Sequence, residues 1–129
     1  MSRWAIGCVL LFMLALSACG GQPPPFSDLP AGDAERGAML FRTSIEEMPT
    51  CNGCHSVQET MINGPALKGL GKVAGERVGG LSAGDYLYQS ISQPAAYLVS
   101  GYANTMYNAY GGRLTAQQIA DLIAYLLTL

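Results

Sequence analysis

The stretch TCNGCHS, residues 50–56, places two thiols and the chain's single histidine within five consecutive positions. Two residues separate Cys51 from Cys54, and His55 follows the second thiol directly. Three kinds of site use this pattern: a structural zinc site, a redox dithiol, and a haem attached through thioether bonds. The rest of the sequence decides among them.

The first two alternatives lack the surroundings they need. A structural zinc site takes about four ligands. The other two cysteines, Cys8 and Cys19, belong to an N-terminal segment discussed below, so only Cys51, Cys54 and His55 could supply thiol or imidazole ligands. A redox dithiol is expected beside a βαβ pattern, and no alternating or β-branched run lies near it. The sequence therefore predicts one haem c, with both thiols added to its vinyl groups and His55 bound to its iron.

An iron bound by His55 in a six-coordinate site needs a second axial ligand, and methionine is the natural candidate in a chain with no second histidine. Met106 lies 51 positions beyond His55 in a glycine- and asparagine-rich stretch, GYANTMYNAYGG. Filling a core gap is the commonest role of methionine, but the helical spacing expected for that role is absent here. The other methionines belong to the N-terminal segment, to a predicted helix or to the neighbourhood of the haem motif: Met1, Met13, Met39, Met48 and Met61.

The N-terminus has the features of an export signal. Arg3 precedes an apolar run, residues 5–15, that is shorter than the roughly 20 residues of a bilayer-spanning helix. The run ends in LSAC, which is similar to the bacterial lipobox, whose cysteine receives a diacylglycerol and becomes the new N-terminus. We predict a signal peptide over 1–18 and lipidation of Cys19; an ordinary cleaved signal and an uncleaved anchor are the alternatives. All three place the domain on the extracytoplasmic, periplasmic side of a membrane.

Residues 19–32 are predicted to be the lipidated N-terminus and a linker. Residues 20–31, GGQPPPFSDLPA, show no periodicity and hold three consecutive prolines. An extended Pro-rich chain of this length reaches roughly 35 Å. The alternative is a coil that lies on the domain. The rest of the chain, residues 33–129, has room for one small domain, and its acidic balance does not suit a nucleic-acid partner.

Capping signals predict three helices. Asp33 is a suitable N-cap for a helix from Ala34 to about Ile45. Ser82 begins a second helix, which Pro94 must end. Thr115 and Gln118 form a capping box for a third, whose apolar residues recur at helical spacing: Ile119, Leu122, Ile123 and Leu126. The glycine-rich segment 69–80 is predicted to be a flexible surface loop.

From Asp33 to Leu129 the chain resembles a class I c-type cytochrome, in the CNGCH motif, NGPALKGL (residues 63–70), the methionine loop and the C-terminal LIAYLLTL. The resemblance implies an all-α fold of three to five helices around one haem. It implies that Gly37 lets the first helix cross the last closely, with Phe41 and Tyr125 packed around the crossing. It also implies that the Pro65 carbonyl accepts a hydrogen bond from the His55 ring. The relatives usually carry proline after the methionine, where this chain has Tyr107.

The function predicted from these features is one-electron transfer, with Arg77, Lys72, Tyr97 and Tyr102 as candidate partners of the haem propionates. Residues 86–106 are similar to cytochrome domains of haem-copper oxidases and of other respiratory complexes, which suggests a quinol-oxidising complex, a terminal oxidase or a copper protein as redox partner. The chain would be an electron carrier in a respiratory or photosynthetic chain, not an enzyme. Two alternatives remain: a fixed subunit of a larger oxidoreductase complex, and a five-coordinate haem sensor or enzyme if Tyr107 displaces Met106.

Overall fold

The computed structural model describes residues 25–129, which form five α-helices and three short 3₁₀ turns and contain no strand. The helices are α1 (Ala34–Leu40), α2 (Leu70–Val73), α3 (Ala83–Ser92), α4 (Tyr110–Arg113) and α5 (Ala116–Leu126), and the turns are η1 (Phe26–Asp28), η2 (Cys51–Gly53) and η3 (Ala74–Glu76). The predicted all-α class is confirmed. None of the helices in this range is long and apolar enough to span a bilayer. The predicted signal peptide and Cys19 lie outside the described residues.

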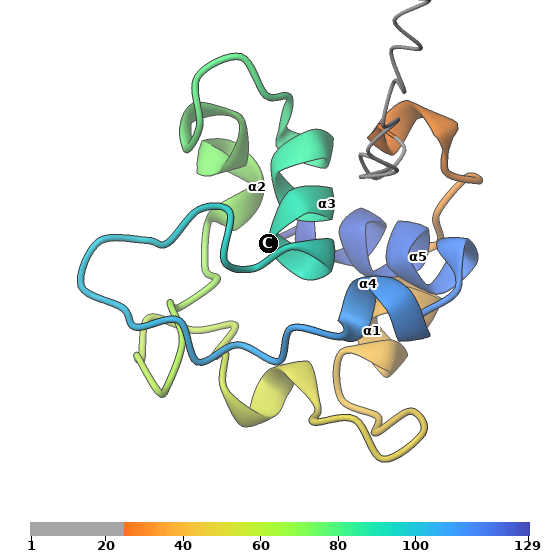
Figure 1. The fold of residues 1–129 in the computed structure, drawn as a ribbon, viewed down its shortest axis with the longest axis horizontal. Coiled ribbons are helices and arrows are strands. Elements are labelled where there is room, and N and C mark those ends of the chain that lie inside the picture. The colour runs from red at the N-terminus through yellow and green to blue at the C-terminus, as the bar shows by residue number, and fades with distance from the viewer. Residues whose placement is uncertain (1–24) are drawn as a thin grey trace, which may run out of the picture.

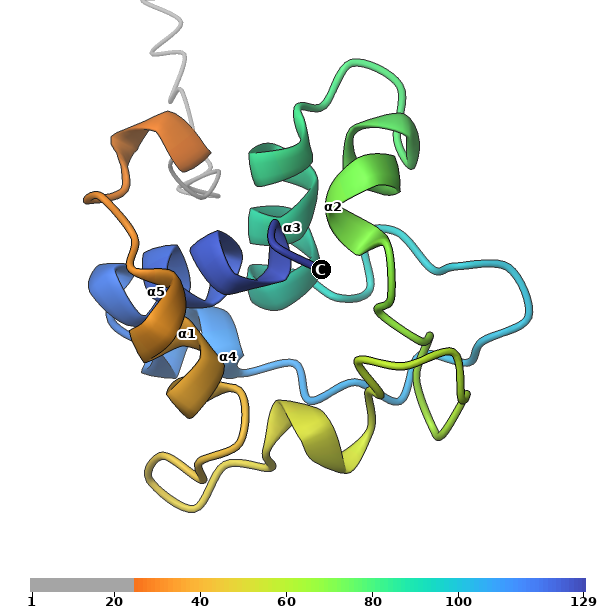
Figure 2. The ribbon, with the colours of Figure 1, turned by 180° about the vertical axis from the view of Figure 1, so that it is seen from behind.

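Helices α1 and α5 cross at one side of the molecule (Figures 1 and 2). A Cβ on Gly37 would overlap the backbone carbonyl of Asp121, so only glycine lets the two helices approach this closely. The rings of Phe41 and Tyr125 pack edge to face beside the crossing, with centroids 5.5 Å apart. The core continues from there onto α3, where Tyr86, Leu87 and Ile91 are buried. Both packing features implied by the family resemblance are present.

The cap of α1 is as predicted, but its C-terminal end is not. The Asp33 carboxylate accepts hydrogen bonds from the backbone N–H groups of Glu35 and Arg36. The helix was expected to reach about Ile45 and instead ends at Leu40. The next bonds span only three residues, as in Thr43 N to Leu40 O at 3.2 Å, and the Thr43 hydroxyl donates to the Met39 carbonyl. These local bonds tighten and end the last turn.

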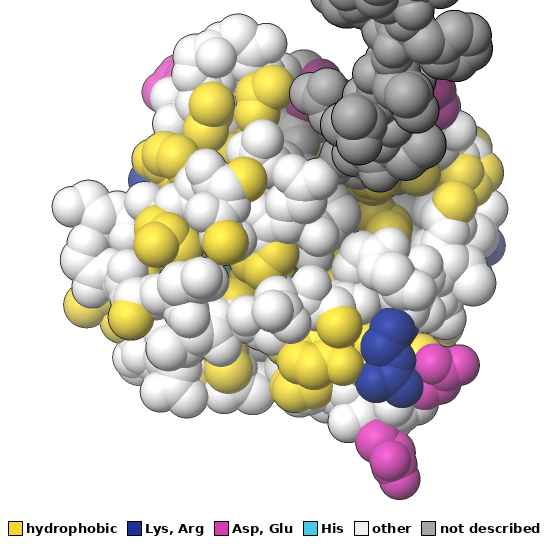
Figure 3. Space-filling view, in the orientation of Figure 1, with side chains coloured by type: hydrophobic (Ala, Val, Ile, Leu, Met, Phe, Trp, Pro, Cys, Tyr) yellow, Lys and Arg dark blue, Asp and Glu magenta, His cyan; other side chains and the backbone are white. Residues whose placement is uncertain are grey.

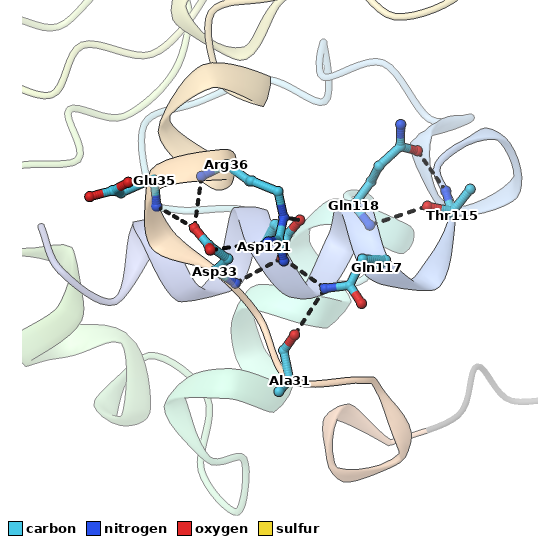
Figure 4. Close-up of polar contacts among 8 residues, drawn as sticks. All are labelled: Ala31, Asp33, Glu35, Arg36, Thr115, Gln117, Gln118 and Asp121. Atoms are coloured by element: carbon cyan, nitrogen blue, oxygen red, sulfur yellow. Dashed lines mark hydrogen bonds and ion pairs between the residues drawn. The ribbon is translucent and has the colours of Figure 1, made fainter.

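The other two predicted helices begin and end as expected. The Ser82 side chain accepts from the Asp85 N–H at the start of α3, and that helix ends two residues before Pro94. At the start of α5, the Thr115 side chain accepts from the Gln118 N–H while the Gln118 side chain accepts from the Thr115 N–H, which completes the capping box (Figure 4).

The prediction of a flexible surface loop over 69–80 is wrong. This segment contains α2 and η3, and it buries Leu70 and Ala74. Gly69 adopts a φ of 75° and donates its N–H to the carbonyl of Leu129 at 2.7 Å. A side chain on Gly71 would overlap the Leu127 carbonyl. The glycines therefore let this short helix pack against the C-terminal end of the chain.

Residues 26–33, which include most of the described part of the predicted linker, lie on the domain surface. The Phe26 ring fills the space left by the absent side chain of Gly84, and the Phe26 N–H donates to Asp85 Oδ1 at 3.1 Å. Further along, Gly32 lies against the backbone of Ala120. We call residues 26–33 the N-terminal strap. It ties the start of the domain to both α3 and α5.

A buried carboxylate joins the strap to the helix crossing (Figure 4). Asp121 is 3% exposed and accepts hydrogen bonds from Arg36 Nε at 2.8 Å and from the Asp33 N–H at 2.8 Å. Gln117 Nε2 donates both to Asp121 and to the Ala31 carbonyl. The hydrogen bond from Arg36, with smaller contributions from the Asp33 N–H and Gln117, lowers the pKa of Asp121 to about 2.

Asp121→Asn should reduce the free energy of unfolding by about 1–2 kcal/mol at pH 7, because it removes the charge that Arg36 pairs with. A carboxyl whose pKa is lowered by folding stabilises the native state above its unfolded pKa of about 4 and loses that effect as the pH falls towards about 2. Denaturant unfolding of wild type and variant at several pH values measures the difference, which should shrink across this window. Asp28→Asn, on the exposed side of η1, is the control; a difference independent of pH would contradict the account.

Candidate haem site

A cavity of about 340 Å³ lies between α3, α5 and the loops over 49–67 and 94–110. Its walls are mostly apolar, and in Figure 3 hydrophobic side chains gather across the front of the molecule while charged ones lie near the edges. The haem-binding residues predicted from the sequence all line this one cavity: Cys51, Cys54, His55, Pro65, Arg77 and Met106.

The CNGCH motif is wound into one tight turn. The Cys51 carbonyl accepts from the N–H of Cys54 at 3.2 Å and from that of His55 at 2.9 Å. Neither thiol is part of a disulfide. Burial, the largest cause, raises the pKa of the Cys51 thiol to about 11, which is opposite to the lowered pKa that makes a dithiol reactive. The turn thus presents both thiols and the imidazole to the same space.

The His55 ring is held from behind by the segment over 63–67. Its Nδ1 lies 2.9 Å from the Pro65 carbonyl oxygen, and with a proton on Nδ1 this is a donated hydrogen bond that leaves the Nε2 lone pair for a metal. A Cβ on Gly64 would come 2.5 Å from His55 Cε1. The Gly64 N–H donates to the Cys54 carbonyl at 2.8 Å and fixes the segment in this place.

Met106 is the only methionine of residues 25–129 among the cavity-lining residues. Met48 is buried in the core at 2% exposure, whereas Met61 and Met39 are 69% and 62% exposed. Met106 itself is half-buried and packs against the core. Of the methionines in this part of the chain, it alone lies in a loop that forms part of the cavity wall.

Arg77 gives the cavity a cationic group. Its Nε atom is buried and has no hydrogen-bond partner among residues 25–129, which marks a donor awaiting an acceptor. Tyr97 and Tyr102 also line the cavity, whereas Lys72 does not. An apolar cavity with one unsatisfied guanidinium nitrogen, two thiols and an imidazole fits a haem, which has an apolar macrocycle and anionic propionates.

The comparison with protein families agrees with this chemistry. Residues 34–129 match the family model described as cytochrome c. The chain therefore belongs to the cytochrome c family, whose members bind haem c covalently and carry electrons. The match begins at the first residue of α1 and includes every cavity-lining residue.

A particular relative supports the same assignment. The chain is 30% identical over 115 residues to a cytochrome c from Guizotia abyssinica, and the alignment covers 78% of this chain and 94% of the relative. Electron transfer by a c-type cytochrome, rather than enzymatic catalysis, follows for this chain.

Some contacts around the cavity had no signal in the sequence. The Tyr110 hydroxyl donates to the Pro49 carbonyl at 2.6 Å, and Arg113 Nη1 donates to the Tyr107 hydroxyl at 3.1 Å. The first contact joins residues 61 positions apart, a pairing that no local spacing reveals. The need for glycine at position 64 is easier to anticipate, because the residue directly precedes Pro65 in the NGP stretch.

Arg77→Gln should lower the reduction potential by on the order of 40 mV, equivalent to about 1 kcal/mol for one electron. A nearby positive charge disfavours the ferric state, so its removal favours oxidation. Potentiometric titration of the purified holoprotein measures the shift. Lys72→Gln is the matched control, because it removes the same charge from a residue that does not line the cavity. Equal shifts in both variants would show that net charge alone is responsible.

Proposed function

We propose that this protein is a membrane-tethered monohaem cytochrome that relays single electrons outside the cytoplasm in a respiratory or photosynthetic chain. The observation that carries the proposal is the convergence of both thiols, the single histidine and Met106 on one cavity. When bound, the haem supplies a reversible one-electron couple, whose potential a thioether ligand and an apolar shell raise.

The residues of the chain have separate roles in this proposal. Cys51 and Cys54 hold the haem covalently, and the Pro65 carbonyl sets the tautomer and orientation of His55. Met106 would supply the second protein ligand of the haem iron. The apolar walls exclude water, and the Arg77 guanidinium offsets the negative charge of a propionate.

The contacts of Tyr107 favour an electron carrier over a five-coordinate sensor or enzyme. That alternative requires Tyr107 to displace Met106. The Tyr107 hydroxyl is instead engaged by Arg113, whose side chain is 42% exposed. The ring of Tyr107 packs edge to face on Tyr110, with centroids 5.0 Å apart. These contacts leave Met106 as the better candidate for the ligand.

The packing of the N-terminal strap on the domain supports a short tether. Because residues 26–33 pack on the domain, only the segment between Cys19 and Pro25 is left to span the distance to a lipid surface, which at most is about 20 Å. In both ribbon views the strap and the loop that carries Met106 lie on opposite sides of the molecule (Figures 1 and 2). A lipid on Cys19 would thus leave the methionine side of the cavity facing away from its anchor.

Cys19→Ser should abolish attachment of the diacylglycerol and disturb processing at that site, since only a thiol can be lipidated. Membrane fractionation, with mass spectrometry of the N-terminus, measures the change. Cys8→Ser is the control, because position 8 lies in the predicted signal peptide and should be absent from the mature protein. An unmodified N-terminus in the wild type would refute the tether and leave the haem assignment intact.

The residues near the cavity support an apolar docking surface for a redox protein. Leu98 and Tyr97 line the cavity and are 45% and 36% exposed, and Ile62 is 50% exposed next to the lining residue Asn63. Arg77 is the one Lys, Arg, Asp or Glu among the lining residues. A quinol-oxidising complex, a terminal oxidase or a copper protein would be the partner. Purification in mild detergent separates a free shuttle from a fixed subunit, which would retain its partners.

A further inference from the structure

The resemblance to class I c-type cytochromes implies a proline after Met106, and this chain has Tyr107 there. A proline would stiffen the methionine loop by fixing its own φ. Tyr107 cannot do this through its backbone. Its side chain instead makes two contacts that hold the loop from outside, one through its ring and one through its hydroxyl.

The ring of Tyr107 is connected, through Tyr110, to the segment just before the CNGCH motif. It packs on Tyr110 at 5.0 Å with an interplanar angle of 74°. The Tyr110 hydroxyl then donates to the Pro49 carbonyl at 2.6 Å. Tyr110 is 7% exposed, so this hydrogen bond is shielded from competing water. Pro49 lies two residues before Cys51.

The hydroxyl of Tyr107 is connected to the same segment through Arg113. Arg113 Nη1 donates to it at 3.1 Å, and Arg113 Nη2 donates to the Glu46 carbonyl at 2.9 Å. Glu46 and Glu47 both adopt left-handed backbone angles, with φ of 48° and 63°. Residues other than glycine pay for that conformation, so a guanidinium bound to the Glu46 carbonyl holds a turn that has little intrinsic preference for its shape.

We propose that Tyr107, Tyr110 and Arg113 form a clamp that positions Met106. The clamp joins the loop that carries Met106 to residues 46–49, which lead directly into Cys51. The two walls of the cavity are thereby fixed relative to each other, and the thioether is kept at the iron against competing ligands. Tyr107 and Arg113 are positioning residues, and their side chains supply the restraint that a proline at position 107 would have given through its backbone.

The test is the affinity of the ferric holoprotein for imidazole, which must displace the Met106 sulfur to reach the iron. Tyr107→Phe and Arg113→Gln should each tighten imidazole binding about 3- to 10-fold, the worth of one hydrogen bond. Adding Tyr107→Phe to Arg113→Gln should not tighten imidazole binding further, because both substitutions remove the hydrogen bond between Arg113 and the Tyr107 hydroxyl. Tyr110→Phe, which keeps the ring and removes the bond to Pro49, should have an effect of similar size.

The matched control is Arg42→Gln, which removes an exposed arginine that also donates to a backbone carbonyl, that of Ala38 at 2.8 Å, on the side of α1. Its imidazole affinity should equal that of the wild type. Global unfolding is measured in parallel. Unchanged imidazole affinity in Tyr107→Phe and Arg113→Gln, with or without a loss of global stability, would overturn the clamp. A double variant whose gain in imidazole affinity equals the product of the two single gains would also overturn it.

The inference rests on the proposed ligation by Met106, and the two fail differently. A ferric wild-type protein without the weak far-red band of iron–sulfur ligation would refute the ligand. A wild type that shows the band, and variants that bind imidazole no more tightly, would refute the clamp alone.

Discussion

The double variant Cys51→Ala/Cys54→Ala should contain no covalently bound haem and should not form a stable domain. Both thiols line the cavity, and thioether bonds to them are the proposed attachment. Without a haem, the fold would have to tolerate a cavity of about 340 Å³. The apolar residues around it would lose the contacts that the bound haem supplies, and a small domain has only about 5–15 kcal/mol of stability to lose.

Absorption spectra after acidic-organic extraction, together with far-UV circular dichroism, measure both effects. The single variants Cys51→Ala and Cys54→Ala are the internal comparison, since each retains one thiol for attachment. They should bind less haem than the wild type and more than the double variant. A double variant that folds and retains haem through extraction would contradict the assigned attachment.

Met106→Ala should lower the reduction potential by on the order of 100 mV, equivalent to about 2 kcal/mol for one electron, and should open the ferrous iron to carbon monoxide. The thioether stabilises ferrous iron, and alanine leaves the position to water or a weaker base. The far-red band of the ferric protein should vanish. Redox titration and carbon monoxide difference spectra measure these changes.

Met61→Ala is the matched control, because Met61 is 69% exposed and lies outside the cavity wall. It should change neither the potential nor the spectrum. Loss of the band in Met61→Ala and its survival in Met106→Ala would mean that the wrong methionine is assigned. A wild type without the band would favour the five-coordinate alternative.

The fold could be predicted where local chemistry decides it. Asp33, Ser82 and Thr115 each cap the helix that follows, and each of these contacts involves residues only two or three positions apart. The segment over 69–80 could not be predicted, because glycine disfavours helix in isolation. Its helix α2 forms through contact with the C-terminal residues, which lie more than fifty positions away in the sequence.

Several of the residues that line the cavity could be named from the sequence for a different reason. The chemistry of haem attachment needs a fixed set of residue types, and a chain with one histidine and few methionines leaves few choices for them. Arg77 could be named only as one of several candidates until its buried Nε was seen at the cavity. The clamp could not be foreseen, because the partners of Tyr110 and Arg113 are backbone carbonyls distant in sequence.

Mass spectrometry of the denatured, mature wild-type protein tests the central claim most directly. Two thioether bonds are covalent, so the mass should exceed that of the polypeptide by one haem in addition to the lipid proposed on Cys19, and proteolysis should return the mass of the haem on the peptide that contains Cys51 and Cys54. Release of all the haem on denaturation, or a polypeptide mass with both thiols free, would contradict the account.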